Sequence, residues 1–117
     1  MTTCKRGEIW TVNFNPGRGS EQKGLRPALI IQNDIGNQYA ATTIVAVITT
    51  TIRKYPVTVI IPNRAGGLKE TSMVNLAQIL TTDKGRLIKK LGSLEKDKMD
   101  EVDVALKISL GIGESSG

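Results

Sequence analysis

Residues 42–51 read TTIVAVITTT, and this run is β-branched at nearly every position. Such side chains are enriched in strands because they pack well on a pleated surface, so the run predicts a central β-strand. Two further stretches extend the pattern. Residues 8–14, EIWTVNF, alternate with a period of two, which predicts a strand, and residues 28–32, ALIIQ, are apolar enough for a buried strand.

Shorter strand patterns fill most of the remaining chain. Residues 57–61, 72–80 and 87–91 carry them, and clusters of Asn, Pro, Gly and Asp separate them. We expect loops or turns at 33–37 and 63–67. Several short strands with this spacing favour a small β-barrel or a sandwich.

The period changes after the last of these strands. The apolar residues there lie three or four positions apart, which predicts an amphipathic helix: Met99, Val102, Leu106 and Leu110. Ser93 is the expected N-cap of this helix, and Gly111 is its expected stop. The sequence therefore predicts a single, mainly β domain over 1–112. It is a small β-barrel with a C-terminal helix, followed by a short flexible tail at 113–117.

Length and composition narrow the class of protein. The chain has 117 residues, room for one domain, and none of its apolar runs approaches the ~18 residues of a membrane span. The first ten residues, MTTCKRGEIW, lack the apolar segment of a signal peptide. The single cysteine, Cys4, excludes an intramolecular disulfide. We therefore expect a cytoplasmic protein with no membrane contact.

The charge is unevenly spread along the chain. The net charge is +5, but residues 1–90 hold 13 Lys and Arg against 5 Asp and Glu, whereas residues 91–117 hold 3 against 6. A basic body indicates an anionic partner, although solubility alone would also account for it. There is no histidine, so a zinc site is nearly excluded and we expect no metal or other cofactor.

Cleavage of RNA is a reaction that needs neither histidine nor metal, because the 2′-hydroxyl of the substrate is the nucleophile. The protein must supply a proton acceptor and donors for the charge that develops on phosphorus. Arg26, between a polar loop and the 28–32 strand, has a planar fork of donors that suits phosphate, but it could equally cap the loop. Thr49 could offer a hydroxyl or simply form a strand.

Four motifs follow one another along the chain. They are RGEIW at 6–10, GSEQKGLRPALIIQND at 19–34, the strand end Ile48-Thr49, and NLAQI at 75–79 with Asp83-Lys84 after it. In this order and spacing they resemble the MazF/PemK family of toxin endoribonucleases of type II toxin–antitoxin systems. The likeness extends over nearly the whole chain.

The resemblance implies an SH3-like β-barrel that forms a symmetric homodimer. It implies sequence-specific cleavage of single-stranded RNA without metal, by attack of the 2′-hydroxyl, to give 2′,3′-cyclic phosphate and 5′-hydroxyl ends. It also implies a MazE-like antitoxin whose acidic, disordered tail lies across the RNA groove.

The family's catalytic residues map onto positions of this chain. The catalytic arginine maps onto Arg26 and the catalytic threonine onto Thr49, while Glu21 is either a base or an organiser of its loop. Further residues are expected to contact RNA: Ser20, Gln22, Lys23, Arg53, Lys54 and Gln78.

Two other functions fit the same barrel. A gyrase-poisoning toxin of the CcdB type would act through its C-terminal helix on a protein partner and would not depend on Arg26. A non-catalytic nucleic-acid-binding barrel would rely on its lysines and arginines and would tolerate loss of Thr49.

Overall fold

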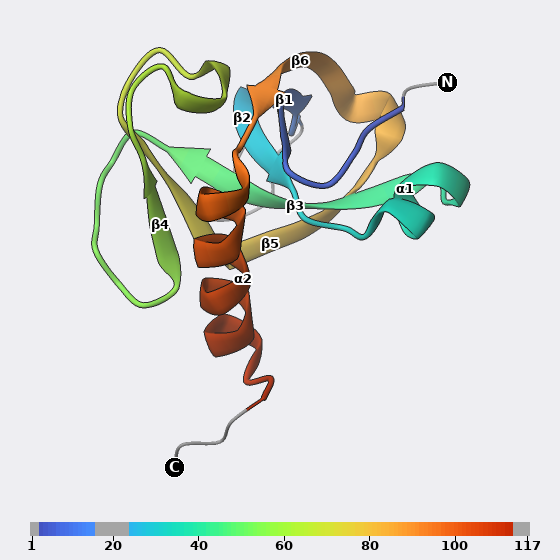
Figure 1. Ribbon diagram of the computed structural model, residues 1–117. Helices are drawn as coiled ribbons and strands as arrows, with labels where there is room; N and C mark the ends of the chain where they lie inside the picture. Colours follow the sequence, from blue (N-terminus) through green and yellow to red (C-terminus); the bar gives the residue numbers. More distant parts are fainter. Residues whose placement is uncertain (1–2, 16–23, 114–117) are drawn as a thin grey trace.

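The structure is a computed structural model that describes residues 3–15 and 24–113. Six strands form one antiparallel sheet in the order β4-β5-β3-β2-β1-β6 (Figure 1). The strands are β1 Glu8–Asn13, β2 Leu25–Ile30, β3 Thr42–Thr49, β4 Thr58–Ile61, β5 Ser72–Asp83 and β6 Leu87–Ser93. Two helices, α1 Asp34–Tyr39 and α2 Lys96–Leu110, and two 3₁₀ turns, η1 Ala65–Gly67 and η2 Lys84–Arg86, complete the fold.

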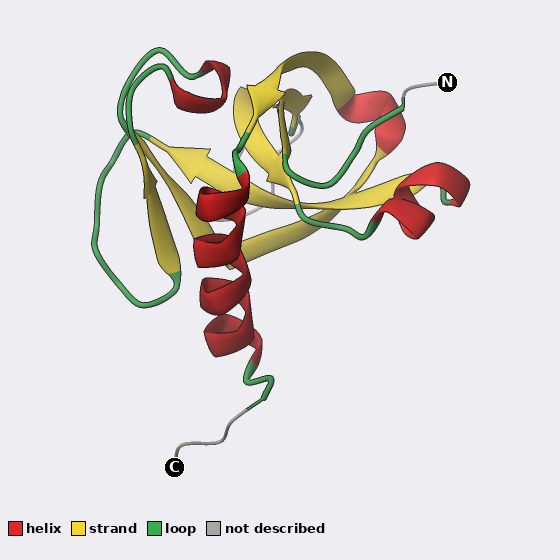
Figure 2. Cartoon of the chain, in the orientation of Figure 1, coloured by secondary structure: helices red, strands yellow, loops and turns green. Residues whose placement is uncertain are grey.

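The mainly β architecture with a C-terminal helix is confirmed. The curled sheet buries apolar side chains on both faces, which explains why its central strands are apolar at successive positions. The helix α2 lies against one face of the sheet (Figure 2), and the apolar cluster between them includes Ile9, Leu29, Ile48, Leu76 and Val102. The second cluster lies on the other face and includes Cys4, Val12, Ala28, Val45 and Leu87. In the described residues no helix is long and apolar enough to cross a membrane.

Strand pairing leaves the sheet open between its edge strands, β4 and β6, in the part of the chain that the structure describes. The turn η1 approaches β6 closely instead. A Cβ added to Gly67 would lie 2.0 Å from the carbonyl oxygen of Leu91, and one added to Gly92 would lie 2.6 Å from the carbonyl carbon of Gly66. This glycine seam makes the sheet barrel-like without a closing ladder.

The second strand begins earlier than its apolar run suggests. Leu25, Arg26 and Pro27 pair with β1, whereas pairing with β3 begins only at Ala28. Proline has no N–H to donate, so Pro27 is tolerated where one side of the strand lacks a partner. Arg26 is therefore held in a strand and not in the preceding loop.

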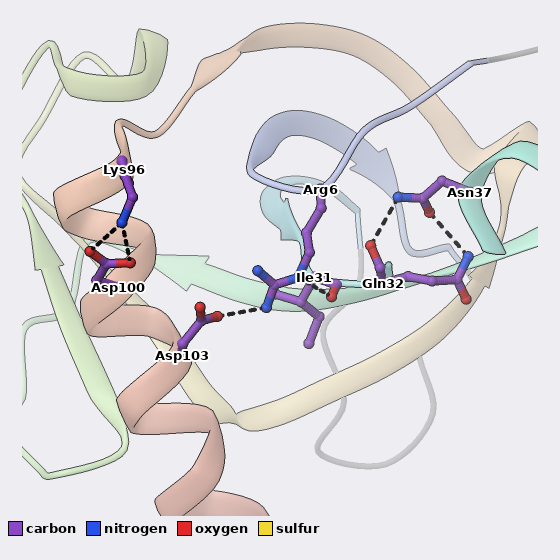
Figure 3. A network of polar contacts seen from close by, with 7 residues as sticks. All are labelled: Arg6, Ile31, Gln32, Asn37, Lys96, Asp100 and Asp103. Carbon is purple, nitrogen blue, oxygen red and sulfur yellow. Dashed lines mark hydrogen bonds and ion pairs between the residues drawn. The ribbon is translucent and has the colours of Figure 1, made fainter. Parts of the chain in front are cut away.

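The expectation of a loop at 33–37 was wrong, because α1 begins there. Asn33 caps this helix: its Oδ1 accepts a hydrogen bond from the Gly36 N–H at 2.8 Å. Asn37 is buried on α1. Its Oδ1 accepts a hydrogen bond from Gln32 Nε2, and its Nδ2 donates to the backbone carbonyl of Gln32, each at 3.0 Å (Figure 3). Six residues are too few to produce a helical period in the sequence.

The expected cap of α2 at Ser93 was also wrong. Ser93 ends β6, and the N-cap is Glu95, whose side chain makes no capping hydrogen bond. The chain stays extended because Leu94 is buried and its N–H donates to the carbonyl of Gly7 at 2.9 Å. At the other end Gly111, with φ of +69°, stops the helix as expected. Leu110, expected on the apolar stripe, is 57% exposed.

Arg6 fastens α2 to the sheet. Its Nη2 lies 2.8 Å from Asp103 Oδ1 on the helix, and its Nε donates to the carbonyl of Ile31 at 2.8 Å (Figure 3). Its backbone N–H donates to Asp34 Oδ1 at 2.7 Å. One arginine thus joins the N-terminal segment, the end of β2, α1 and α2.

Candidate active site

Arg26 and Thr49 lie on the strands at the centre of the sheet. In the β2–β3 register Ala28 is opposite Val47. Arg26 and Thr49 lie two residues beyond this pair, so they are on the same face of the sheet as Ala28 and Val47, past the point where the pairing of the two strands ends. Arg26 is exposed and Thr49 is half-buried. The two residues therefore share one face at the end of a rigid strand pair.

The hydroxyl of Thr49 is already oriented. Its Oγ1 accepts a hydrogen bond from the Thr51 N–H at 3.1 Å. A hydroxyl that accepts through oxygen keeps its own hydrogen as a donor. Thr49 can therefore donate toward a group that lies between it and Arg26.

The segment with Arg53 and Lys54 is anchored beside Thr49. Met73 of β5 pairs with Thr49 of β3, and the Met73 Sδ accepts a hydrogen bond from the Arg53 N–H at 3.2 Å. Thr58 Oγ1 donates to the carbonyl of Arg53 at 3.0 Å. The Arg53 and Lys54 side chains are exposed. The backbone at Arg53 is thus held beside the strand position that pairs with the threonine.

The third strand of the site contributes amides. The β3–β5 register shifts between Ala46 and Val47, where β5 bulges over residues 76–78. Gln78, an expected RNA contact, is exposed in this bulge. Asn75 at its edge is half-buried and pairs with Val47. Sequence reasoning did not select Asn75, although an asparagine inside an apolar strand pattern was an available signal.

Four of the expected site residues, Ser20, Glu21, Gln22 and Lys23, lie outside the described residues. The chain on either side of them is well held. The Phe14 N–H donates to the Gly24 carbonyl at 2.9 Å, and the Gly24 N–H donates to Asn15 Oδ1 at 2.8 Å. Arg86 Nη1 donates to the Asn13 carbonyl at 3.0 Å and also to the Asn15 carbonyl.

Arg86 is a second residue that sequence reasoning missed. It comes from η2, far along the chain, and it fixes the end of β1 beside the strand that carries Arg26. Only the three-dimensional structure joins these segments, so no local signal could have revealed the contact.

The groups with shifted pKa values serve the fold and lie away from Arg26. Burial alone would raise the pKa of Glu8, but hydrogen bonds from the Trp10 indole, the Lys5 N–H and Lys90 lower it overall. The Arg6 N–H, followed by the Asn37 amide, lowers the pKa of Asp34. Both carboxylates are acceptors in structural contacts.

Two further features of the described residues are the Cys4 thiol and the arrangement of the possible metal ligands. Burial raises the pKa of the Cys4 thiol, despite a hydrogen bond with Thr43 that acts in the opposite direction. Within residues 3–15 and 24–113, no group of three or more Cys, Asp or Glu side chains is placed to hold a metal ion.

Comparison with known proteins gives consistent results over nearly the whole chain. Residues 5–110 match the family described as PemK-like, MazF-like toxin of type II toxin-antitoxin system. The chain is 46% identical over 110 residues to Endoribonuclease EndoA of Bacillus subtilis (strain 168), covering 92% of this chain and 95% of that protein.

Solved structures agree with this match. A mycobacterial endoribonuclease in complex with its cognate antitoxin superposes with a TM-score of 0.82 at 27% identity, over 95% of this chain and 98% of that one. MazF from Deinococcus radiodurans gives 0.81 at 26% identity, over 96% and 100%.

Proposed function

Because the chain belongs to the PemK/MazF family of type II toxin–antitoxin toxins and is an endoribonuclease, we propose that it cuts single-stranded RNA on the face that carries Arg26 and Thr49. The observation that supports this assignment is the β2–β3 register, by which the two residues share one face just beyond the last pair of the two strands. A phosphate bound there would meet a guanidinium fork on one side and a hydroxyl on the other.

The proposed reaction uses the 2′-hydroxyl of RNA as the nucleophile. Its oxygen forms a bond to the adjacent phosphorus, the bond from phosphorus to the 5′-oxygen breaks, and the leaving oxygen takes up a proton. The products are a 2′,3′-cyclic phosphate and a 5′-hydroxyl. Arg26 stabilises the charge on the pentacoordinate phosphorus, and Thr49 donates to a phosphate oxygen.

Arg26 acts through charge and not as an acid. Arginine side chains are permanently cationic in proteins, so this group supplies charge and hydrogen-bond donors. The general base therefore has to come from elsewhere. Glu21 remains the candidate base or loop organiser by family resemblance alone.

The path of the RNA follows from the cations beside the site. Arg53 and Lys54 are anchored at Met73 and Thr58, and we place the neighbouring phosphates on them. Gln78 is proposed to contact the RNA from the β5 bulge. Ser20, Gln22 and Lys23 are proposed to contact the RNA from the segment before β2.

The partners follow the family pattern. The antitoxin is a protein partner of this toxin family, and we propose that an acidic, MazE-like tail covers the same cationic face. A homodimer and a cytoplasmic location belong to the same proposal. The match to a named endoribonuclease favours RNA cleavage over a gyrase poison and over a barrel that binds without cutting.

The test is cleavage of a long unstructured RNA in EDTA, followed by mapping of the new ends. We expect cuts at one short sequence, each with a 5′-hydroxyl end. An oligonucleotide with a single 2′-deoxy sugar at the cut position should resist cleavage, because the nucleophile is missing. Cleavage of that oligonucleotide at the same bond would overturn the mechanism, and an antitoxin-free, folded protein that cuts no RNA would overturn the function.

A further inference from the structure

Asn75 lies on the same face of the sheet as the candidate site. It pairs with Val47 of β3 and with Thr58 of β4, and Met73, two residues earlier on β5, pairs with Thr49. Opposite residues in antiparallel strands share a face, as do residues two apart on one strand. Asn75 is thus a diagonal neighbour of Thr49, at about 7 Å.

The amide of Asn75 has a defined orientation. Its Oδ1 accepts a hydrogen bond from the Ala77 N–H at 2.9 Å. A flipped amide would turn its NH₂ group against this N–H, so the network assigns oxygen to the bulge side. The Nδ2 hydrogens have no hydrogen-bond partner within the described residues. The side chain therefore presents donors from a half-buried position.

The β5 bulge accounts for the oxygen of the Asn75 amide but not for its NH₂ group. Asparagine is depleted in strands, and a half-buried polar group is unfavourable unless it is hydrogen-bonded. The hydrogen bond from the Ala77 N–H accounts for Oδ1, while the NH₂ group makes no hydrogen bond with the residues that the structure describes. A donor fixed in this way, one row from Thr49, suits recognition of an acceptor on the substrate.

We propose that Asn75 determines base specificity beside the scissile phosphate, an inference that rests on the proposed function. Its Nδ2 donates to the exocyclic keto oxygen of one base, which is O4 of uracil or O6 of guanine. Cytosine and adenine carry an amino group at the corresponding position and would oppose donor to donor. The site therefore prefers a keto base to an amino base at that nucleotide.

The neighbouring residues fit this division of labour. Phosphate contacts position a nucleic acid, and contacts to base edges specify its sequence. The Arg53 backbone is held by Met73, two residues before Asn75 on β5, and by Thr58, which pairs with Asn75. The cations would hold the backbone while Asn75 contacts one base.

The test is sequencing of 5′-hydroxyl ends from an RNA pool with a randomised segment. Asn75→Asp keeps an oxygen for the Ala77 N–H but replaces the outward donor with an acceptor. At one position next to the cut we expect preference to move from uracil or guanine to cytosine or adenine. Asn75→Ser, which is neutral, should reduce the wild-type preference there about tenfold and leave other positions unchanged. If Asn75→Asp does not fold, Asn75→Ser alone tests the inference.

Ala77→Asp is the matched control, because it adds the same charge in the same bulge and keeps the Asn75 amide. It should retain the wild-type preference. Unchanged preference in both Asn75 variants, an equal shift in Ala77→Asp, or loss of cleavage at every sequence by folded Asn75→Ser would overturn this inference alone. Failure of the wild type to cut RNA would instead overturn the proposed function and, with it, this inference.

Discussion

In the proposed mechanism Thr49 acts through one hydroxyl hydrogen, and this role can be separated from its role as a strand residue. Thr49→Val keeps the β-branched shape and removes the donor. We expect the single-turnover cleavage rate to fall about a hundredfold, as it does when one donor to a developing oxyanion is lost. The fold should lose only the hydrogen bond from the Thr51 N–H, worth about 1 kcal/mol.

Thr49→Ser is the control for this prediction, because it restores the hydroxyl without the methyl group. It should recover most of the rate. A Thr49→Val protein that cleaves within twofold of the wild type would show that the hydroxyl takes no part in the reaction.

Some residues could be selected from the sequence and others could not. An arginine before Pro27 and a threonine at a strand end are visible there, but the choice of Arg26 and Thr49 as catalytic residues came from the family motifs and remains a prediction. That both lie on one face depends on register, which is a property of two strands. Asn75 was visible as a polar residue within an apolar strand pattern and was not selected, whereas Arg86 was missed because its contacts join segments that the sequence separates.

The seam between η1 and β6 depends on Gly67, so a side chain at this position should destabilise the packing of the two elements. Gly67→Ala would bring a Cβ to 2.0 Å from the Leu91 carbonyl oxygen at a φ of +82°. We expect a loss of about 3 kcal/mol in the free energy of unfolding, measured by urea denaturation.

Gly85→Ala is the matched control, because a Cβ there meets open space. It should change the free energy of unfolding by less than about 0.5 kcal/mol. Equal effects of the two substitutions would mean that the close approach of η1 to β6 does not stabilise the fold.

Glu8 links stability to pH. Its pKa is lower in the folded state than in the unfolded chain, so its contribution is complete above the unfolded value of about 4 and is lost as pH falls through the folded value. Glu8→Gln should lower stability at pH 7 by about 1–2 kcal/mol. It should also flatten the decline below pH 4, although Asp34 retains part of that slope.

Thermal melts between pH 2 and pH 7 would measure this effect. The exposed Glu70→Gln serves as the control and should follow the wild-type curve. A Glu8→Gln curve parallel to the wild type over the whole range would contradict the assigned contacts with Lys5, Trp10 and Lys90.

Elements with a clear period were predictable, and short or tertiary elements were not. The six strands and α2 follow from alternation and from three-to-four spacing, with ends displaced by a few residues. The helix α1 is too short to show a period. The start of α2 is set by burial of Leu94 and its contact with Gly7, neither of which is encoded near Ser93.

The helix α2 and the residues Arg26 and Thr49 lie on opposite faces of the sheet. The helix, with four acidic and three basic side chains, packs on the first apolar cluster, whereas Arg26 and Thr49 lie on the face of the second cluster. The sequence is basic over residues 1–90 and acidic over residues 91–117. The homodimer remains a prediction. Apolar side chains such as Ile108 are exposed, but exposure alone does not identify the surface that would cover them.

Whether RNA is cut at the Arg26 face is measured most directly by comparing wild type with Arg26→Ala in EDTA. Single-turnover rates on one oligonucleotide that contains the mapped cut sequence would be recorded after both proteins show matching melts. We predict a loss of a hundredfold or more, since the charge on phosphorus would lose its guanidinium partner. Cleavage by Arg26→Ala at the same bond and within twofold of the wild-type rate would show that the reaction does not depend on Arg26.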